Sequence, residues 1–157
     1  MAKLEVTLHQ LEARNLYGVW GKSNDKAIAK DIAHISQQYY QITKKEKGNV
    51  LPFFVLSKDY NPSTQDFALF VGSVANSNCL ESAVLPQGLY AKITVKPKFG
   101  FLWGLAIGEA KRFFYTQWLP TTSDYKALNL EYEHHTQASI GRLPAIDILF
   151  AVTEKTL

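Results

Sequence analysis

The sequence holds a single cysteine, Cys79, among its 157 residues. One cysteine excludes an intramolecular disulfide, and CxxC or zinc-ribbon sites need at least two. We therefore expect a reducing, cytoplasmic location. Histidines do not supply a metal site instead: His134 and His135 are adjacent on an expected strand and point to opposite faces, while His9 and His34 lie far away in the chain. The sequence predicts no metal and no cofactor.

Long apolar runs are missing as well. No segment approaches the ~20 apolar residues that cross a bilayer, and no apolar stretch of a signal peptide follows Lys3. The chain also lacks a strong excess of either charge: it has 17 basic and 14 acidic residues, for a net charge of +3. Nucleic-acid binding needs a stronger basic face. We expect no membrane contact and no direct contact with nucleic acid.

Aromatic residues, in contrast, are abundant: nine Phe, eight Tyr and three Trp make up 13% of the chain. The hydrophobic share of 46% and the charged share of 20% are typical of a globular chain, and 157 residues fit one domain with a real core. Aromatic side chains fill cores, and they also line pockets for flat or cationic ligands. Composition alone leaves both roles open.

Apolar periodicity predicts strands and two helices. Alternating or continuous apolar residues indicate strands at residues 4–9, 16–20, 51–56, 67–71, 89–95, 128–133 and 146–152. The stripe from Ile28 to Ile42 predicts a helix capped by Ser23 or Asn24. A second helix is expected over residues 101–118, ended by Pro120.

These elements repeat one order, strand-helix-strand-strand, in a first half of about 1–78 and a second half of about 88–157. We expect a single α+β domain over residues 1–157, built from two pseudo-symmetric repeats. Its antiparallel sheet would carry both helices on one face.

Glu131 is the residue on which a functional interpretation depends. Leu128, Leu130 and Tyr132 alternate with Asn129, Glu131 and Glu133 along a strand that lies between two heavily apolar stretches. A carboxylate in this setting is either a solvent-facing strand residue or the charged group of an apolar site. Glu133 shares the strand face and competes for the same role.

The second half resembles the GyrI-like, or AraC-type effector-binding, domain that also forms the drug-binding part of multidrug-responsive regulators. The resemblance rests on Gly88-Leu89-Tyr90-Ala91 before a strand, Trp118-Leu119-Pro120 at a helix end, Leu130-Glu131-Tyr132 at the Phe-Glu signature, and the closing Ile146–Val152 strand. Leu16–Val19 is similar to the Val-Gly strand of the first half. Leu130 replaces the usual Phe, and Ala151 replaces the usual Pro.

The resemblance implies a duplicated fold with a central ligand cleft between the halves. In relatives that bind cationic drugs, aromatic side chains line the cleft and the signature Glu meets the positive charge. Without an attached DNA-binding domain, the chain looks like a stand-alone member. Such members serve as ligand binders, as an inhibitor of DNA gyrase, or as hydrolases of cyclopropane-bearing toxins.

Elementary electrostatics supports a cation site at a buried glutamate. An apolar setting disfavours the charged carboxylate, and a cation within ~4 Å would relieve this by about 4 kcal/mol at an effective dielectric of 20. Aromatic rings add roughly 0.5–2 kcal/mol each. We predict that Glu131 binds the ligand and that aromatic residues wall the site: Trp20, Phe54, Tyr90, Trp103 and Tyr132.

The sequence favours a small-molecule-binding protein for aromatic or lipophilic cations over an enzyme. The alternative is a hydrolase that uses Glu131 with a nearby Tyr, since no GxSxG nucleophile motif is present. A second alternative is a protein-interaction module such as a gyrase inhibitor, with a protein partner or a homodimer.

Overall fold

Eight strands and two main helices make up the computed structural model, which describes residues 4–46, 48–77, 79–96 and 103–155, with only the backbone of Trp103. The strands are β1 (Thr7–Leu11), β2 (Arg14–Asn24), β3 (Phe53–Lys58), β4 (Asp66–Ser73), β5 (Glu81–Leu85), β6 (Gly88–Val95), β7 (Tyr125–His135) and β8 (Ile146–Glu154). The helices are α1 (Ile28–Thr43), α2 (Trp103–Phe113) and α3 (Leu119–Thr121), with a π-helical turn at Phe114–Trp118 and a 3-10 turn at Gln137–Ser139.

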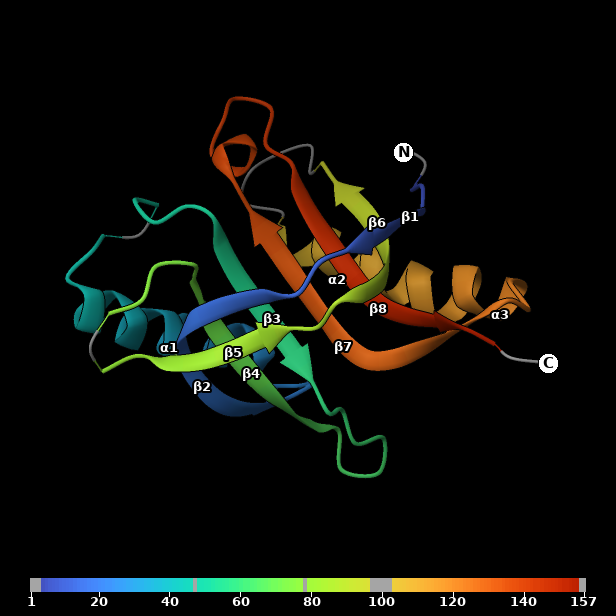
Figure 1. Ribbon diagram of the computed structural model, residues 1–157, viewed down its shortest axis with the longest axis horizontal. Coiled ribbons are helices and arrows are strands. Elements are labelled where there is room, and N and C mark those ends of the chain that lie inside the picture. The colour runs from blue at the N-terminus through green and yellow to red at the C-terminus, as the bar shows by residue number, and fades with distance from the viewer. Residues whose placement is uncertain (1–3, 47, 78, 97–102, 156–157) are drawn as a thin grey trace.

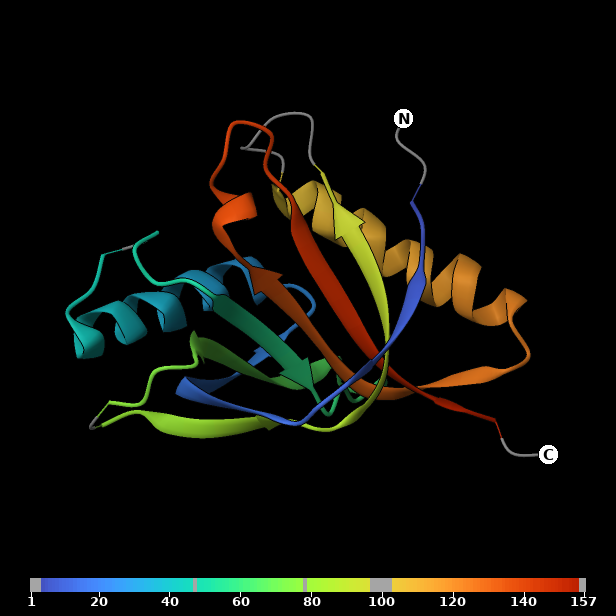
Figure 2. The ribbon, with the colours of Figure 1, turned by 45° about the horizontal axis from the view of Figure 1, so that its top comes forward.

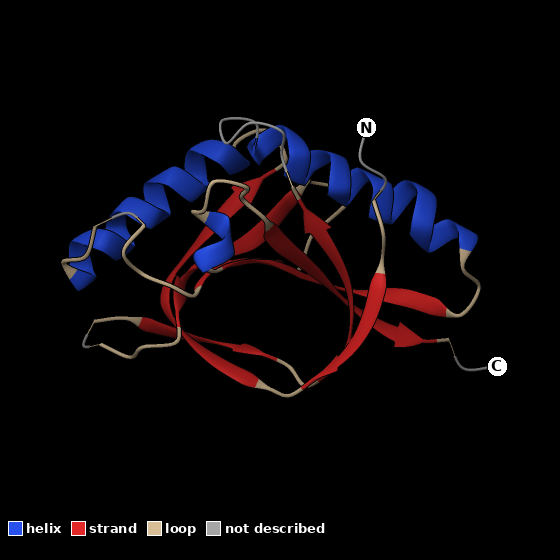
Figure 3. Ribbon diagram, turned by 90° about the horizontal axis from the view of Figure 1, so that it is seen from above, coloured by secondary structure: helices blue, strands red, loops and turns tan. Residues whose placement is uncertain are grey.

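All eight strands join one antiparallel sheet in the order β1-β6-β8-β7-β3-β4-β2-β5. The sheet curls strongly, and both helices lie on its outer face (Figures 1 and 3). Helix α1 packs on β2 and β4, whereas α2 packs on β6 (Figure 2). The predicted α+β class, with an antiparallel sheet and both helices on one face, is confirmed.

The order strand-helix-strand-strand occurs twice, as β2-α1-β3-β4 and as β6-α2-β7-β8. The first set lies in the sheet as β3-β4-β2 and the second as β7-β8-β6, and β3 pairs with β7 where the sets meet. This arrangement places β7 near the middle of the sheet. The proposed origin of the two sets as repeats stays a prediction.

The two faces of the sheet hold separate apolar cores, because successive residues of a strand point to opposite faces. Under α1 lies a cluster that includes Ile35, Tyr39, Val55, Leu69 and Val71, and under α2 lies one that includes Ala91, Ile93, Phe114, Ile148 and Phe150. The concave inner face holds a third cluster, which includes Leu16, Phe54, Phe70, Tyr90, Tyr132 and Leu149. Any residue of β7 therefore belongs either to the helix-facing side or to the concave side.

Strand β7 is irregular at Asn129. Between Ala127 and Glu131 it carries two residues more than the facing stretch of β8, and Asn129 adopts a left-handed backbone with φ of 59°. The Asn129 side chain accepts a hydrogen bond from the Tyr60 amide at 2.7 Å and donates one to the Tyr60 carbonyl at 3.0 Å. These two contacts fix the irregularity against the loop that joins β3 to β4.

The ends of both helices differ from the prediction. The N-cap of α1 is Ala27, because β2 extends through Asn24 and the Asn24 side chain instead accepts hydrogen bonds from the amides of Lys26 and Ala27. The second helical segment does not end at Pro120. In the π-helical turn before it, the Leu119 amide donates its backbone hydrogen bond to the Phe114 carbonyl, five residues earlier. Pro120 then lies in the first turn of α3, where a missing N–H is tolerated.

Gly18 of β2 and Gly72 of β4 lie opposite each other and allow their strands to approach closely. A Cβ atom at Gly72 would lie 2.3 Å from the Tyr17 carbonyl oxygen. We expect Gly72→Ala to lower the free energy of unfolding by about 1–3 kcal/mol, because the backbone cannot yield as a side chain can. Urea denaturation measures this change.

Gly108 of α2 provides the matched control, since a Cβ there meets no atom within 4 Å. Gly108→Ala should stabilise the protein by about 0.5–1 kcal/mol through the lower backbone entropy of alanine in the unfolded chain. Equal effects of the two substitutions would contradict the close approach of β2 and β4.

Candidate functional site

Two glutamates of β7 face the helix side of the sheet near its centre. Glu133 is 6% exposed, and the Glu131 side chain is 17% exposed. Glu131 pairs across the sheet with Ser57 and Phe150, and Glu133 pairs with Val55 and Ile148. Glutamate is rarely buried unless it has a charged or hydrogen-bonding partner, so the partners of these carboxylates define the site.

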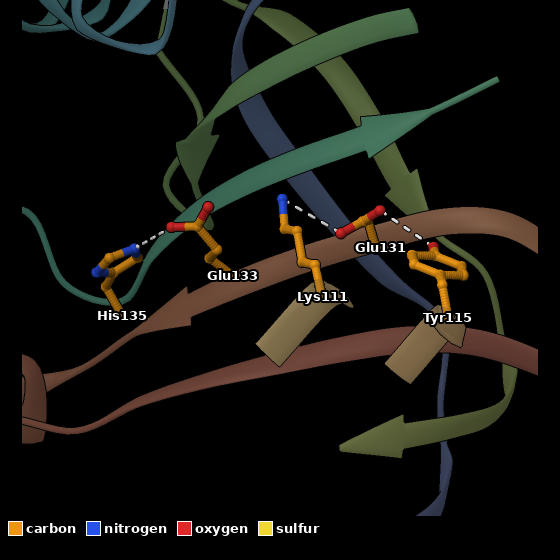
Figure 4. A network of polar contacts seen from close by, with 5 residues as sticks. All are labelled: Lys111, Tyr115, Glu131, Glu133 and His135. Atoms are coloured by element: carbon orange, nitrogen blue, oxygen red, sulfur yellow. Dashed lines mark hydrogen bonds and ion pairs between the residues drawn. The ribbon is translucent and has the colours of Figure 1, made fainter. Parts of the chain in front are cut away.

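Helix α2 and the π-helical turn supply the partners of Glu131 (Figure 4). The Lys111 Nζ lies 3.2 Å from Glu131 Oε2, and the Tyr115 hydroxyl donates a 3.1 Å hydrogen bond to Glu131 Oε1. On the other side of Lys111, the His135 Nε2 lies 3.0 Å from Glu133 Oε1. Figure 4 shows the Lys111 side chain extending between the two carboxylates.

Lys111 is held in its charged form by these carboxylates. Burial lowers the pKa of Lys111, but the charges of Glu131 and Glu133 and the contact with Glu131 outweigh burial and raise the pKa above its ordinary value. Asp25, which lies just before α1, acts in the same direction. The charges of three carboxylates thus act on one ammonium.

Glu131 Oε2 is buried and, within the described part of the chain, has no hydrogen bond of good geometry. Its partner is the Lys111 ammonium, which is a charge contact rather than a well-aligned hydrogen bond. A cation that contacted this oxygen with better hydrogen-bond geometry than Lys111 would stabilise the carboxylate further.

Aromatic rings border the carboxylate on the α2 side. The Tyr115 ring meets Phe114 edge-on at 4.9 Å and Phe150 edge-on at 5.6 Å, and Phe114 stacks on Phe150 at 3.9 Å between centroids. Burial, followed by the charge of Glu131, raises the pKa of Tyr115. Its hydroxyl therefore keeps its proton at neutral pH and acts as a donor.

The structure does not bring most of the predicted wall residues to Glu131. Trp20, Phe54, Tyr90 and Tyr132 all belong to, or pack against, the concave cluster on the opposite face of the sheet. Tyr132 follows Glu131 directly on β7, and strand alternation places the two side chains on opposite faces. The backbone of Trp103 begins α2, and its side chain lies outside the described part of the structure.

The four concave aromatic residues make their own contacts. The Trp20 ring packs on Phe70, and its Nε1 donates to the Ser82 carbonyl at 2.9 Å. The Tyr132 ring lies 6.0 Å from that of Phe54 and 5.7 Å from that of Tyr90. These side chains form one aromatic group on the inner face of the curled sheet.

Sequence reasoning missed Lys111, Tyr115 and the Glu133–His135 pair. One signal was available: Lys111 and Tyr115 are four residues apart, a spacing that places both on one face of a helix. A lysine and a tyrosine on one apolar face indicate an acidic partner across the interface. The partner itself, Glu131, was predicted as a site residue.

The described residues contain no group of three or more His, Cys, Asp or Glu side chains that could hold a metal ion. No helix in the same part of the chain is long and apolar enough to cross a membrane.

No family model matches the sequence, and no curated protein matches it either. Solved structures do share its fold. SAV2435 bound to tetraphenylphosphonium has 14% sequence identity and a TM-score of 0.68, over 95% of this chain and 94% of that one. An integron cassette protein from the mobile metagenome of Vibrio cholerae has 11% identity and a TM-score of 0.68, over 97% and 100% of the two chains.

The C-terminal domain of EcmrR is also similar, with 14% identity and a TM-score of 0.61 over 97% of this chain and 99% of that one. At these identities the similarity establishes the fold. This chain thus shares its fold with a cation-bound protein.

Lys111 and Glu131 should be energetically coupled. We expect Lys111→Met and Glu131→Gln each to lower the free energy of unfolding by about 1–2 kcal/mol, between the effects typical of exposed and of buried pairs. The double variant should lose less than the sum, with a coupling of about 1 kcal/mol. Urea denaturation of the four proteins at low and high salt measures it, and strict additivity would contradict the pairing.

Stability should decline in alkaline solution. Burial raises the pKa of Tyr90 to about 12 and raises those of Tyr115 and Tyr132 above 10.0, the ordinary value. The stabilisation is complete below pH 10.0 and is lost as the pH rises toward the folded-state values, because only the unfolded chain releases these protons there. Tyr132→Phe should flatten the decline by up to about 1.4 kcal/mol per pH unit. Parallel profiles of the wild type and the variant would contradict this assignment.

Proposed function

We propose that this chain is a ligand-binding domain of the GyrI-like type, acting in the cytoplasm, and that Glu131 binds the positive charge of a lipophilic organic cation. The observation that carries the proposal is the charge balance on the helix side of β7. Asp25, Glu131 and Glu133 act on a single ammonium, that of Lys111, and one oxygen of Glu131 lacks a well-aligned hydrogen bond. The shared fold of SAV2435, which was solved with a phosphonium cation, supports the same ligand class.

Lys111 takes the place of the ligand charge in the free protein. A bound cation would displace its ammonium from Glu131, and the Lys111 side chain, already 22% exposed, would turn toward solvent. Because one ion pair replaces another, the net gain from charge is smaller than the ~4 kcal/mol of a cation meeting an unpaired carboxylate at 4 Å. Contact with the Tyr115 ring, which is 38% exposed, supplies part of the remaining affinity.

A hydrolase is the second candidate, favoured by the contact between the Tyr115 hydroxyl and Glu131. This contact is the pairing of a carboxylate with a tyrosine that acid–base catalysis by Glu131 requires. The raised pKa of Tyr115 suits a proton donor rather than a base. Turnover of cyclopropane-bearing or otherwise electrophilic small molecules, lost in both Glu131→Gln and Tyr115→Phe, would favour catalysis over binding alone.

Glu131→Gln should weaken binding of methyltriphenylphosphonium by about 10- to 100-fold, since the amide keeps the shape of the side chain but loses its charge. Binding of the neutral analogue triphenylphosphine oxide should change by less than about 2-fold. Isothermal titration calorimetry measures both. Glu109→Gln, which replaces an exposed glutamate of α2, is the control for removal of one negative charge. Equal losses for the cation and the neutral analogue would contradict charge pairing at Glu131.

Lys111→Met should have the opposite effect and strengthen binding of the phosphonium cation by about 10-fold, because the ligand no longer competes with an internal ammonium. The titration is performed at pH 8. Lys30→Met, which replaces an exposed lysine of α1, controls for the change in net charge. Weaker cation binding in Lys111→Met than in Lys30→Met would show that Lys111 supports the site rather than occupying it.

A further inference from the structure

The concave face of the sheet holds a cavity that the helix-side site does not use. Its volume is about 240 Å³, and its lining includes Arg14, Glu12, Tyr90 and Tyr132, with apolar residues of β1 and β5. This cavity lies beside the aromatic group of the concave face, on the opposite side of β7 from Glu131. Its chemistry is therefore independent of the carboxylates between the helices.

Arg14 brings a positive charge to the cavity without a direct ion-pair partner among the described residues. Its guanidinium lies 5.3 Å from the centroid of the Phe54 ring, and in the described part of the chain its side chain forms no ion pair within 4.0 Å. The Arg14 charge is felt by both Tyr132 and His134. The guanidinium thus stands over the aromatic group, with its donors available to an incoming group.

Tyr132 contributes an unused hydroxyl. Across the described residues this hydroxyl makes no hydrogen bond to another protein group, whereas the neighbouring Tyr90 hydroxyl donates to the Pro86 carbonyl at 2.6 Å. Burial raises the pKa of Tyr132, so its hydroxyl remains a donor at neutral pH. Two donors, one of them charged, therefore serve the same cavity.

Three other titratable groups lie near Arg14: His134, Asp147 and Glu12. Burial, followed by the Arg14 charge, lowers the pKa of His134, which is therefore neutral at pH 7 and stacks flat on Phe54 at 4.8 Å. The Asp147 carboxylate accepts a 2.7 Å hydrogen bond from the Thr94 hydroxyl. Glu12 is exposed in the turn between β1 and β2, where its negative charge opposes a second anionic group on a ligand.

We propose that this cavity is a second ligand site, for a small flat molecule with one carboxylate, which Arg14 binds as a charged pair while Tyr132 donates a hydrogen bond to it. Arginine matches a carboxylate with two parallel N–H donors. The rings of Tyr90 and Tyr132 offer faces and edges to an aromatic group. The cavity volume of about 240 Å³ lies just below the ~300 Å³ of the smallest drug-sized sites. The ligand should therefore be no larger than a single substituted ring.

The test uses 3-phenylpropanoate as the probe and 3-phenylpropanamide as its neutral isostere, titrated into the 157-residue protein by calorimetry and by ligand-observed NMR. We expect the carboxylate to bind at least about 10-fold more tightly than the amide. Arg14→Gln should remove that preference, and Tyr132→Phe should weaken the carboxylate about 3- to 10-fold with little effect on the amide. Phthalate, which carries two carboxylates, should bind more weakly than the monoanion.

Arg112→Gln is the matched control, because it removes one exposed arginine from α2 on the other face of the sheet. It should leave binding of 3-phenylpropanoate within about 2-fold of the wild type, and thermal melting should show that all three variants fold. Equal losses in Arg14→Gln and Arg112→Gln would overturn the proposal. So would equal affinities for the acid and the amide, or no binding of the acid at millimolar concentration.

Discussion

The ion pair between Lys111 and Glu131 joins α2 to the centre of the sheet, and the charge balance of the helix side depends on it. Without the lysine, the two glutamates of β7 would repel each other across a surface that is largely closed to water. With it, Glu131 has an opposite charge beside it, while Tyr115 contacts Glu131 and His135 contacts Glu133. The pair also positions α2, since Lys111 and Tyr115 both contact Glu131 from successive turns of one helical segment. Under the proposed function, stability and ligand binding compete for the same carboxylate.

Strand β7 separates two environments of opposite character. Its helix-facing residues present negative charge, whereas its concave-facing residues, Tyr132 and His134, lie near the Arg14 guanidinium. The separation follows from alternation alone and needs no additional element. A single central strand thus contributes side chains to both of the proposed sites, whose proposed ligands carry opposite charges. Because the sheet is curled, the concave side is enclosed by the protein's own strands rather than by the helices (Figure 3).

The α+β class and the element order could be predicted from sequence, because apolar alternation and helical stripes are local signals. Glu131 was also singled out from the sequence, since its strand and motif are contiguous, and its role in ligand binding stays a prediction. The wall residues could not be assigned to a face relative to Glu131, except for Tyr132, whose adjacency already placed it on the other side. Trp20, Phe54 and Tyr90 come from three other strands, and their facing depends on register and curl, which arise only in the assembled sheet. Lys111 was missed because a helical lysine is usually solvated, and its burial depends on where α2 packs. Strand β5 was missed because it has only five residues and begins with two polar ones, Glu81 and Ser82.

The irregularity at Asn129 has a consequence for how β7 tolerates change in length. It adds two residues to β7 relative to β8, an even number that preserves which side chains face the helices. A one-residue insertion or deletion between Asn129 and His135 would exchange the two sets, moving carboxylates into the aromatic interior and tyrosine under the helices. Only substitutions, or length changes of two residues, would leave these side chains on their present faces.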